Sequence, residues 1–193
     1  MICSTLSPRY FARLAERMPD GLHLIDAPMS GAQVAADEAR LSFMLGGADA
    51  DLDVLEPMFR TMGRKLHRMG GSGAGMTAKV LNNFIAALSL AGVRQVLDWA
   101  DDLGVDQDRL MALMHDSSGQ TWFGSNFDAI EFARDGYDAG NTIGIVRKDV
   151  ESCLDAVDPA SHAGLPAALV AAIGALAPRA RPREILTAAT NSP

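Results

Sequence analysis

The first seventy residues alternate between short apolar runs and amphipathic segments. Apolar residues recur at helical spacing from Pro8 to Met18 and from about Ala50 to Thr61, with Thr5 or Ser7 and then Asp49 as candidate N-caps. Residues 22–27, 41–45 and 65–69 have the length and composition of short strands. Such alternation of strand and helix predicts an α/β fold for this part of the chain.

Beyond residue 69 the pattern predicts helices and no convincing strand. One helix should run from near Gly73 to about Leu103, since no proline and a single glycine interrupt it, and it would be roughly 45 Å long. That length exceeds one small core and predicts a helix that spans domains or subunits. Further helices are predicted at 106–115, 126–134, 145–157 and 165–176, so the fold class is α/β followed by all-α.

The long helix carries Lys79 and Asn83 one turn apart, so the two polar groups lie on one face. Asparagine is a poor helix former, and two in succession suggest a role other than helix propensity. A lone helical lysine is usually a solvated surface group. If it is partly desolvated, its pKa falls toward neutrality and it becomes an acid/base group, with Asn83 holding it or a substrate hydroxyl. An apolar stripe is predicted on another face: Leu81, Phe84, Ile85, Leu88, Gly92, Val96 and Trp99.

Three other segments have both a structural and a functional interpretation. Ser30 and Gly31 follow a predicted strand. They are either ordinary turn residues or, with one hydroxyl and exposed backbone N–H groups, a binding site for a small anion. Gly73-Ala-Gly-Met-Thr-Ala78 has the form G-x-G-x-x-A, but no parallel strand with an acidic end follows, so a flexible turn is the better interpretation. Lys148-Asp149 is most often an exposed pair on a helix.

Composition narrows the class of protein. Of the 193 residues 48% are apolar and 21% are charged, as in a globular protein, and the net charge of -7 without a basic block argues against a nucleic-acid partner. The two cysteines and four histidines match no metal or disulfide spacing, which predicts no metal and a reducing cytoplasm. No run of about eighteen apolar residues and no signal peptide is seen, which predicts no membrane partner.

Five motifs in order resemble those of one enzyme family. They are Cys3-Ser-Thr-Leu-Ser-Pro8 (family pattern D-x-S-T-x-x-P), Asp26-Ala-Pro-Met-Ser-Gly31 (D-A-P-V-S-G-G), Gly73 to Asn83, Ser117-Ser-Gly119 with Trp122, and Lys148-Asp149. The family is that of the β-hydroxyacid dehydrogenases, which includes 3-hydroxyisobutyrate dehydrogenase and tartronate semialdehyde reductase. The likeness is expected to end near Leu176.

The resemblance implies an oxidoreductase that moves hydride between NAD or NADP and a small β-hydroxyacid. It also implies a homodimer or higher homo-oligomer and two domains: residues 1–69, the C-terminal part of a Rossmann-like nucleotide-binding domain, and residues 70–193, an all-helical domain built on the long helix. The site residues it implies are Lys79 as acid/base, Asn83 as its helper and substrate ligand, Ser30 and Gly31 for the substrate carboxylate, and Thr5 and Lys148 for the cofactor.

The sequence departs from the family pattern in ways that set further expectations. The phosphate-binding G-x-G-x-x-G half of the nucleotide domain is absent, so an N-terminal truncation and weak binding of NAD or NADP by this chain alone are expected. Ala32 stands where the family has a second glycine and is expected to narrow the carboxylate pocket; Cys3 replaces an aspartate. An alternative is an inert fragment that serves only as a helical dimerisation module. An imine reductase relative is a third reading, against which Lys79 argues.

Overall fold

The computed structural model describes residues 1–127, 130, 137–138 and 141–176, which fall into two compact units. The first is Met1–Phe84 with Lys148–Pro166, and the second is Ile85–Arg147 with the chain from Ala167 on. The units therefore interleave along the sequence, and each is described by itself. The predicted domains 1–69 and 70–193 stay predictions.

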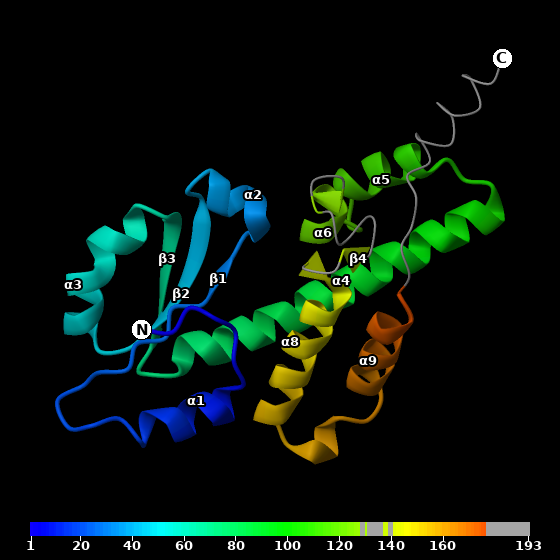
Figure 1. The fold of residues 1–193 in the computed structure, drawn as a ribbon. Coiled ribbons are helices and arrows are strands. Elements are labelled where there is room, and N and C mark those ends of the chain that lie inside the picture. The colour runs from blue at the N-terminus through cyan, green and yellow to red at the C-terminus, as the bar shows by residue number, and fades with distance from the viewer. Residues whose placement is uncertain (128–129, 131–136, 139–140, 177–193) are drawn as a thin grey trace. The chain divides into compact units, whose positions relative to one another are not determined.

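A three-stranded sheet with the order β1-β2-β3 lies in the first unit (Figure 1). β2 (Leu41–Gly46) pairs in parallel with β3 (Gly63–Gly70), and α3 (Asp49–Arg60) connects them. β1 (Met29–Ser30) pairs antiparallel with β2, with Ser30 opposite Ser42. A parallel pair joined by a helix is the unit from which α/β domains are built, so the predicted α/β class is confirmed.

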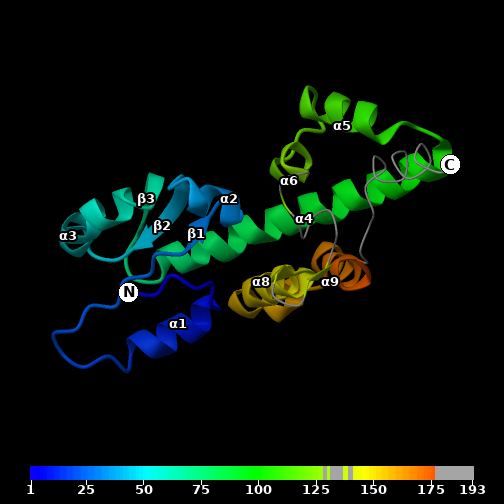
Figure 2. The ribbon, with the colours of Figure 1, turned by 45° about the horizontal axis from the view of Figure 1, so that its top comes forward.

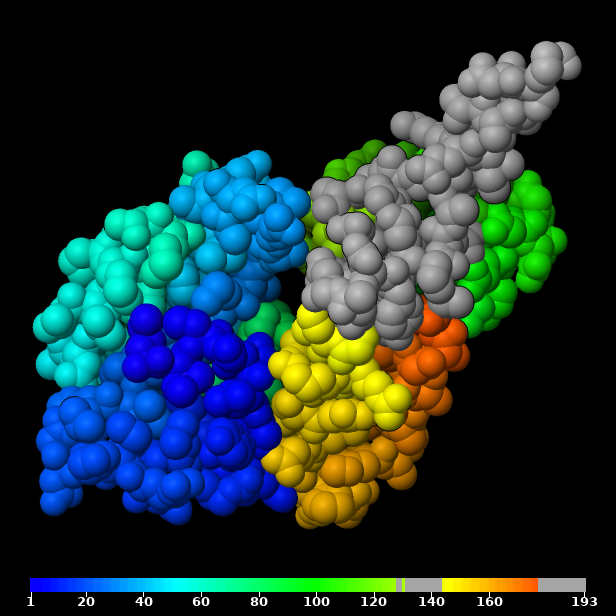
Figure 3. All heavy atoms as spheres, in the orientation of Figure 1, coloured from blue at the N-terminus to red at the C-terminus, as the bar shows by residue number. Residues whose placement is uncertain are grey.

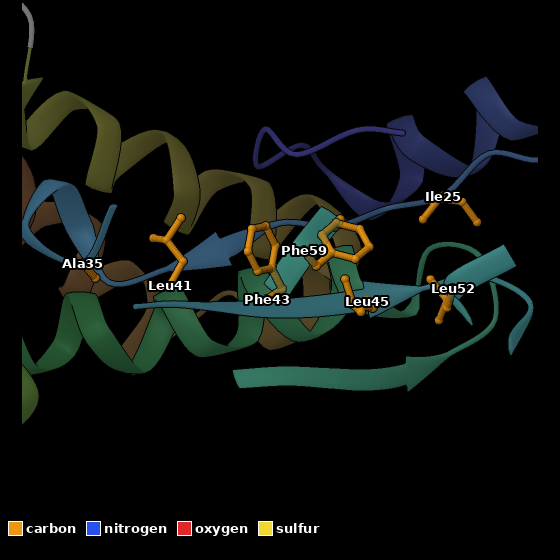
Figure 4. Packing of buried hydrophobic residues seen from close by; sticks show 8 residues of the cluster. Ile25, Ala35, Leu41, Phe43, Leu45, Leu52 and Phe59 are labelled. Carbon is orange, nitrogen blue, oxygen red and sulfur yellow. The ribbon is translucent and has the colours of Figure 1, made fainter. Parts of the chain in front are cut away.

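The core of this sheet is a cluster of aliphatic and aromatic side chains between the strands and α3 (Figure 4). Phe43 of β2 and Phe59 of α3 stack at a tilt with ring centroids 5.1 Å apart. The buried members of the cluster are Ile25, Ala27, Ala35, Leu41, Phe43, Leu45, Leu52 and Phe59.

The strand predicted at residues 22–27 is largely wrong. Only Asp26 pairs, in isolated bridges parallel to Ile2 and antiparallel to Gly46. Leu22 and His23 are exposed, while Ile25 to Ala27 are buried. Ile25 to Ala27 exchange backbone hydrogen bonds with Ile2 on one side and Gly46 on the other, so the pairing is limited to the buried end of the predicted strand.

Two helix starts differ in how they are capped. Ser7 caps α1 (Pro8–Ala15) by accepting a hydrogen bond from the N–H of Tyr10, as predicted. The predicted cap of α3 is wrong, because its N-cap is Ala48 and Asp49 lies in the first turn. The carboxylate of Asp49 accepts a hydrogen bond from Arg68 at 3.0 Å instead, and this ion pair competes with local capping.

The remaining elements are mostly helical (Figure 2). They are α2 (Ala32–Asp37), α4 (Ala74–Leu103), α5 (Gln107–His115), α6 (Trp122–Ser125), β4 (Tyr137–Asp138), β5 (Asn141–Thr142), α8 (Ile143–Ala156), the 3-10 turn η2 (Pro159–Ser161) and α9 (Leu165–Ala175). Four of the five helices predicted after residue 69 are confirmed, and the one at 126–134 lies mostly outside the described residues. The antiparallel pair β4·β5 corrects the prediction that no strand follows residue 69.

The apolar stripe predicted on α4 is not the face that the helix buries. The buried apolar residues are Met76, Val80, Ala87, Leu90, Val93, Leu97 and Ala100, whereas Leu81, Ile85 and Trp99 are exposed. Both faces are apolar, so periodicity alone could not choose between them. By length and composition α4 could also cross a membrane, but core helices pass the same test, and the absence of a membrane partner stays a prediction.

Candidate active site

A buried carboxylate fixes the start of α4. Asp26 is fully buried, and its two oxygens accept hydrogen bonds from the backbone N–H groups of Gly73 at 2.7 Å and Met76 at 2.6 Å. These N–H groups have no partner inside the helix, so Asp26 caps α4 from a distant segment. The start of α4 is thereby tied to the segment that leads into Ser30. Sequence reasoning missed this role, whose one signal was an acidic residue inside an apolar run.

The glycine-rich start of α4 is closed to a phosphate group. A side chain at Gly75 would begin 2.3 Å from the carbonyl oxygen of Met44, so this glycine lets the helix pack directly on β2. Asp26 occupies the N–H groups that a diphosphate would need. Both observations support the interpretation that the G-x-G-x-x-A segment is no dinucleotide fingerprint.

The segment Thr5–Ser7 is held between α4 and α8. The N–H of Leu6 lies 3.2 Å from the sulfur of Met76, and the hydroxyl of Ser7 donates to Asp155 of α8. The ammonium of Lys148, at the start of the α8 portion of this unit, donates to the carbonyl oxygen of Thr5 at 3.1 Å. Figure 3 shows the dark-blue N-terminal residues beside the yellow residues of α8. Thr5 and Lys148, the two predicted cofactor residues, are therefore in contact.

Lys79 lies on the buried side of α4 with 8% of its surface exposed. Burial lowers the pKa of its ammonium from 10.5 to about 8; the carboxylate of Asp149 opposes this fall and the ammonium of Lys148 adds to it. Among the residues that the structure describes, no hydrogen bond to its amine is found. A lysine in this state exchanges a proton near neutral pH, which a solvated lysine does not.

Asn83 is bound to a second buried carboxylate. Its amide nitrogen donates to Oδ2 of Asp149 at 2.5 Å, and Asp149 is 7% exposed. Oδ1 of Asp149 is also buried, accepts no hydrogen bond within the described part of the chain, and lies 2.6 Å from the ammonium of Lys148. The interpretation of Lys148-Asp149 as an exposed pair is thus wrong for the aspartate, while the lysine side chain is half exposed.

Ser30 and Gly31 lie at the end of β1. Gly31 has a φ of +137°, and a side chain there would begin 2.4 Å from Cβ of Ala35, so only glycine fits this bend. Ser30 is part of β1 rather than of the turn. Lys148 contacts both Thr5 and Asp149, and Asp149 binds Asn83, while the charges of Asp149 and Lys148 act on Lys79. Ser30 and Gly31 make no hydrogen bond to that group among the described residues and are linked to it through Asp26.

Comparisons with known proteins identify the family. Residues 1–71 match the family described as the NAD binding domain of 6-phosphogluconate dehydrogenase. Residues 73–189 match the family described as NAD-binding of NADP-dependent 3-hydroxyisobutyrate dehydrogenase. The second match continues past Leu176, so the expectation that the likeness ends there is wrong.

Individual relatives point to the same family. The 3-hydroxyisobutyrate dehydrogenase of Pseudomonas aeruginosa is 36% identical over 121 residues, which is 62% of this chain and 41% of that protein. The structure of the Mycobacterium tuberculosis 3-hydroxyisobutyrate dehydrogenase with L-serine is 26% identical, with a TM-score of 0.61 over 78% of this chain and 54% of that one. The structure of a 3-hydroxyisobutyrate dehydrogenase from Salmonella typhimurium, 22% identical, shares the fold with a TM-score of 0.75 over 90% of this chain and 62% of that one.

The fold and the family matches define the class: a relative of the nicotinamide-nucleotide dehydrogenases, with a Rossmann-like part and a helical part. More narrowly, the chain belongs to the β-hydroxyacid dehydrogenase family. It spans about two fifths of the length of the curated relatives that it matches.

Proposed function

We propose that this chain carries the acid/base lysine, the substrate turn and part of the cofactor contact of an NAD(P)-dependent dehydrogenase. Its substrate is a small β-hydroxyacid of the 3-hydroxyisobutyrate type. The observation that carries the proposal is the state of Lys79, which is buried on α4 with a pKa of about 8, one turn from Asn83. A buried ammonium destabilises the fold, so its presence here favours a chemical role.

Lys79 moves the proton of the substrate hydroxyl. In the oxidising direction its neutral amine accepts that proton while the C–H bond of the carbinol carbon breaks, and a carbonyl forms. In the reducing direction the ammonium returns the proton to the carbonyl oxygen. A pKa of about 8 keeps both protonation states accessible near neutral pH, which is the condition for a general acid/base. Asn83 holds the hydroxyl in line with the amine.

The described residues fit one end of the nicotinamide cofactor. Thr5 has a hydroxyl, and Lys148 has three N–H donors, of which one is hydrogen-bonded to the carbonyl oxygen of Thr5, while its ammonium forms an ion pair with Asp149. These two residues would hold the nicotinamide end, and bound NAD or NADP supplies the hydride acceptor. The start of α4 does not fit the diphosphate, since Asp26 fills it. The weak affinity predicted for this chain follows from the same facts.

Ser30 and Gly31 orient the substrate carboxylate. One hydroxyl and the exposed backbone of a bend suit a small anion, and positioning of this kind lowers the barrier without new chemistry. Two names support the class of substrate: the Pseudomonas aeruginosa relative is a 3-hydroxyisobutyrate dehydrogenase, and the Mycobacterium tuberculosis structure was solved with L-serine. 3-Hydroxyisobutyrate and L-serine both carry a carboxylate and a β-hydroxyl.

Turnover of hydroxyacids tests the proposal. We expect reduction of NAD or NADP, supplied at millimolar concentration, when the chain meets 3-hydroxyisobutyrate or L-serine. Lys79→Ala should lower the rate by about 10²- to 10⁴-fold, the share that a general base contributes. The matched control is Lys65→Ala on the exposed side of β3, which should keep the rate. Equal rates in Lys79→Ala and the unchanged chain would refute the role of the lysine.

The alternative function is a dimerisation module without turnover. The exposed apolar side chains of α4, Leu81, Ile85 and Trp99, favour it, because such surfaces often mark contacts with other proteins. Light scattering and turnover assays on the unchanged chain and on Lys79→Ala separate the two functions. No turnover in either form together with an unchanged dimer would support the module, and titration that shows micromolar NAD or NADP affinity would contradict the weak binding predicted above.

A further inference from the structure

We infer that Asp149 is a positioning residue that fixes the orientation of the Asn83 amide and sets the protonation of Lys79. The inference deepens the proposed function and rests on it for the role of Lys79 as acid/base. It concerns a residue for which the sequence suggested only an exposed ion pair.

The first step is the orientation of Asn83. A buried ionised carboxylate can only accept hydrogen bonds, so the amide of Asn83 must turn its NH₂ group to Oδ2 of Asp149. Its carbonyl oxygen then faces elsewhere and, among the residues that the structure describes, accepts a hydrogen bond from the exposed Asn82 at 3.2 Å. A substrate hydroxyl can replace that long bond. Asp149 thereby keeps the acceptor end of Asn83 available for the hydroxyl whose proton Lys79 takes.

The second step is charge. Asp149 is buried, and the charged groups that act on Lys79 are Asp149 and Lys148, both from α8. The segment before α1 adds the uncharged carbonyl of Thr5, which anchors Lys148. The carboxylate stabilises the ammonium form of Lys79 against the cost of burial. Without it, Lys79 would lose its proton too readily to act as an acid in the reducing direction.

A contribution to stability does not explain the position of Asp149. One of its oxygens, Oδ1, is buried, lacks a hydrogen bond within the described part of the chain, and faces the ammonium of the half-exposed Lys148. A buried acceptor without hydrogen bonds costs stability. A carboxylate in that state, bound to Asn83 and beside Lys79, is explained by what it does to these two side chains.

The test measures the pKa of Lys79 directly, so it does not depend on turnover. Lysine amines labelled by reductive ¹³C-methylation are titrated by NMR, and Lys79→Arg assigns the signal. In Asp149→Asn the pKa of Lys79 should fall by about 1, the effect of removing a nearby opposite charge. The matched control is Glu151→Gln, which removes one charge from an exposed position of the same helix and should leave the pKa in place. An unchanged pKa in Asp149→Asn overturns the inference.

Two further measurements separate position from charge. Asp149→Glu keeps the charge but displaces it by one methylene, so we expect a pKa near that of the unchanged chain with a hydroxyacid KM raised about tenfold. Where turnover is measured, the pH at which the oxidation rate rises should move down by about 1 in Asp149→Asn. A lower rate with an unmoved pH profile would mean a merely structural role and also overturn the inference. Absence of turnover in every form would count against the proposed function but leave the NMR result decisive.

Discussion

Asp26 and Asp149 are two buried carboxylates of the same compact unit, and they differ in what they bind. Asp26 accepts hydrogen bonds from two backbone N–H groups of α4, and both of its oxygens are used. Asp149 faces two side chains, an amide and an ammonium, and one oxygen lacks a hydrogen bond among the described residues. Backbone partners tie two elements together, whereas side-chain partners can be oriented and titrated. Burial alone therefore does not distinguish a carboxylate that holds two elements together from one that belongs to a candidate active site.

Loss of Asp26 should cause the largest change in stability. Asp26→Ala leaves two N–H groups of α4 buried without a partner, and we expect the free energy of unfolding to fall by about 3 kcal/mol. Asp149→Ala should cost about 1 kcal/mol, because its oxygens are only partly satisfied. Urea unfolding followed by circular dichroism gives both values. Asp49→Ala, an exposed acid in the first turn of α3, is the control and should change little.

Equal losses for the two buried aspartates would break the comparison. In that case Asp149 would be a structural contact between α4 and α8, just as Asp26 is one between residues 22–27 and α4. Its effect on Lys79 would then be incidental.

Sequence reasoning predicted the parts of this region that depend on local pattern. The helix that carries Lys79 and Asn83 follows from a long stretch without proline, and β2 follows from a short apolar run. The resemblance placed Ser30, Lys79 and Asn83 on known motifs. Each of these inferences uses residues that are near one another in the sequence, where spacing carries the information.

What the sequence could not predict depends on contacts between distant segments. Asp26 caps a helix that starts 47 residues later, and Asp149 binds an amide 66 residues earlier. No periodicity marks such pairs. The stripe on α4 failed for a related reason, since both faces of that helix are apolar and only the packing of its neighbours selects the buried one.

Lys79, like Asp149, has a proposed chemical role, and its buried ammonium should destabilise the fold. Its pKa is about 8 in the folded chain and 10.5 without burial, so the unfolded chain binds more protons between these values and stability rises as the pH rises through this window. Below pH 8 the full cost of burying the charge is present. Lys79→Met should therefore raise the free energy of unfolding at pH 7 by about 2 to 3 kcal/mol, while it removes the proposed acid/base group.

Urea unfolding of the unchanged chain and of Lys79→Met at pH 7 and pH 10 checks the predicted gain in the free energy of unfolding. The difference between them should shrink toward the higher pH, with Lys65→Met on the exposed side of β3 as the control. A difference that is the same at both pH values would show that the ammonium of Lys79 is solvated, and the general-base proposal would lose its main support.

The smallest effect is expected at Ala32, in the turn after Ser30 that is proposed to bind the substrate. Ala32 has a φ of +57°, in the left-handed region that costs a residue with a side chain about 1 kcal/mol or more. Glycine avoids this cost but loses more freedom on folding, so Ala32→Gly should raise stability by only about 0.5 kcal/mol. Ala36→Gly, inside α2 and also exposed, should lower it instead. A gain in stability for Ala32→Gly and a loss for Ala36→Gly in urea unfolding would show that the turn after Ser30 costs stability, as the buried ammonium of Lys79 does. A loss of stability in both variants would show that this turn, like Asp26, contributes to the stability of the fold.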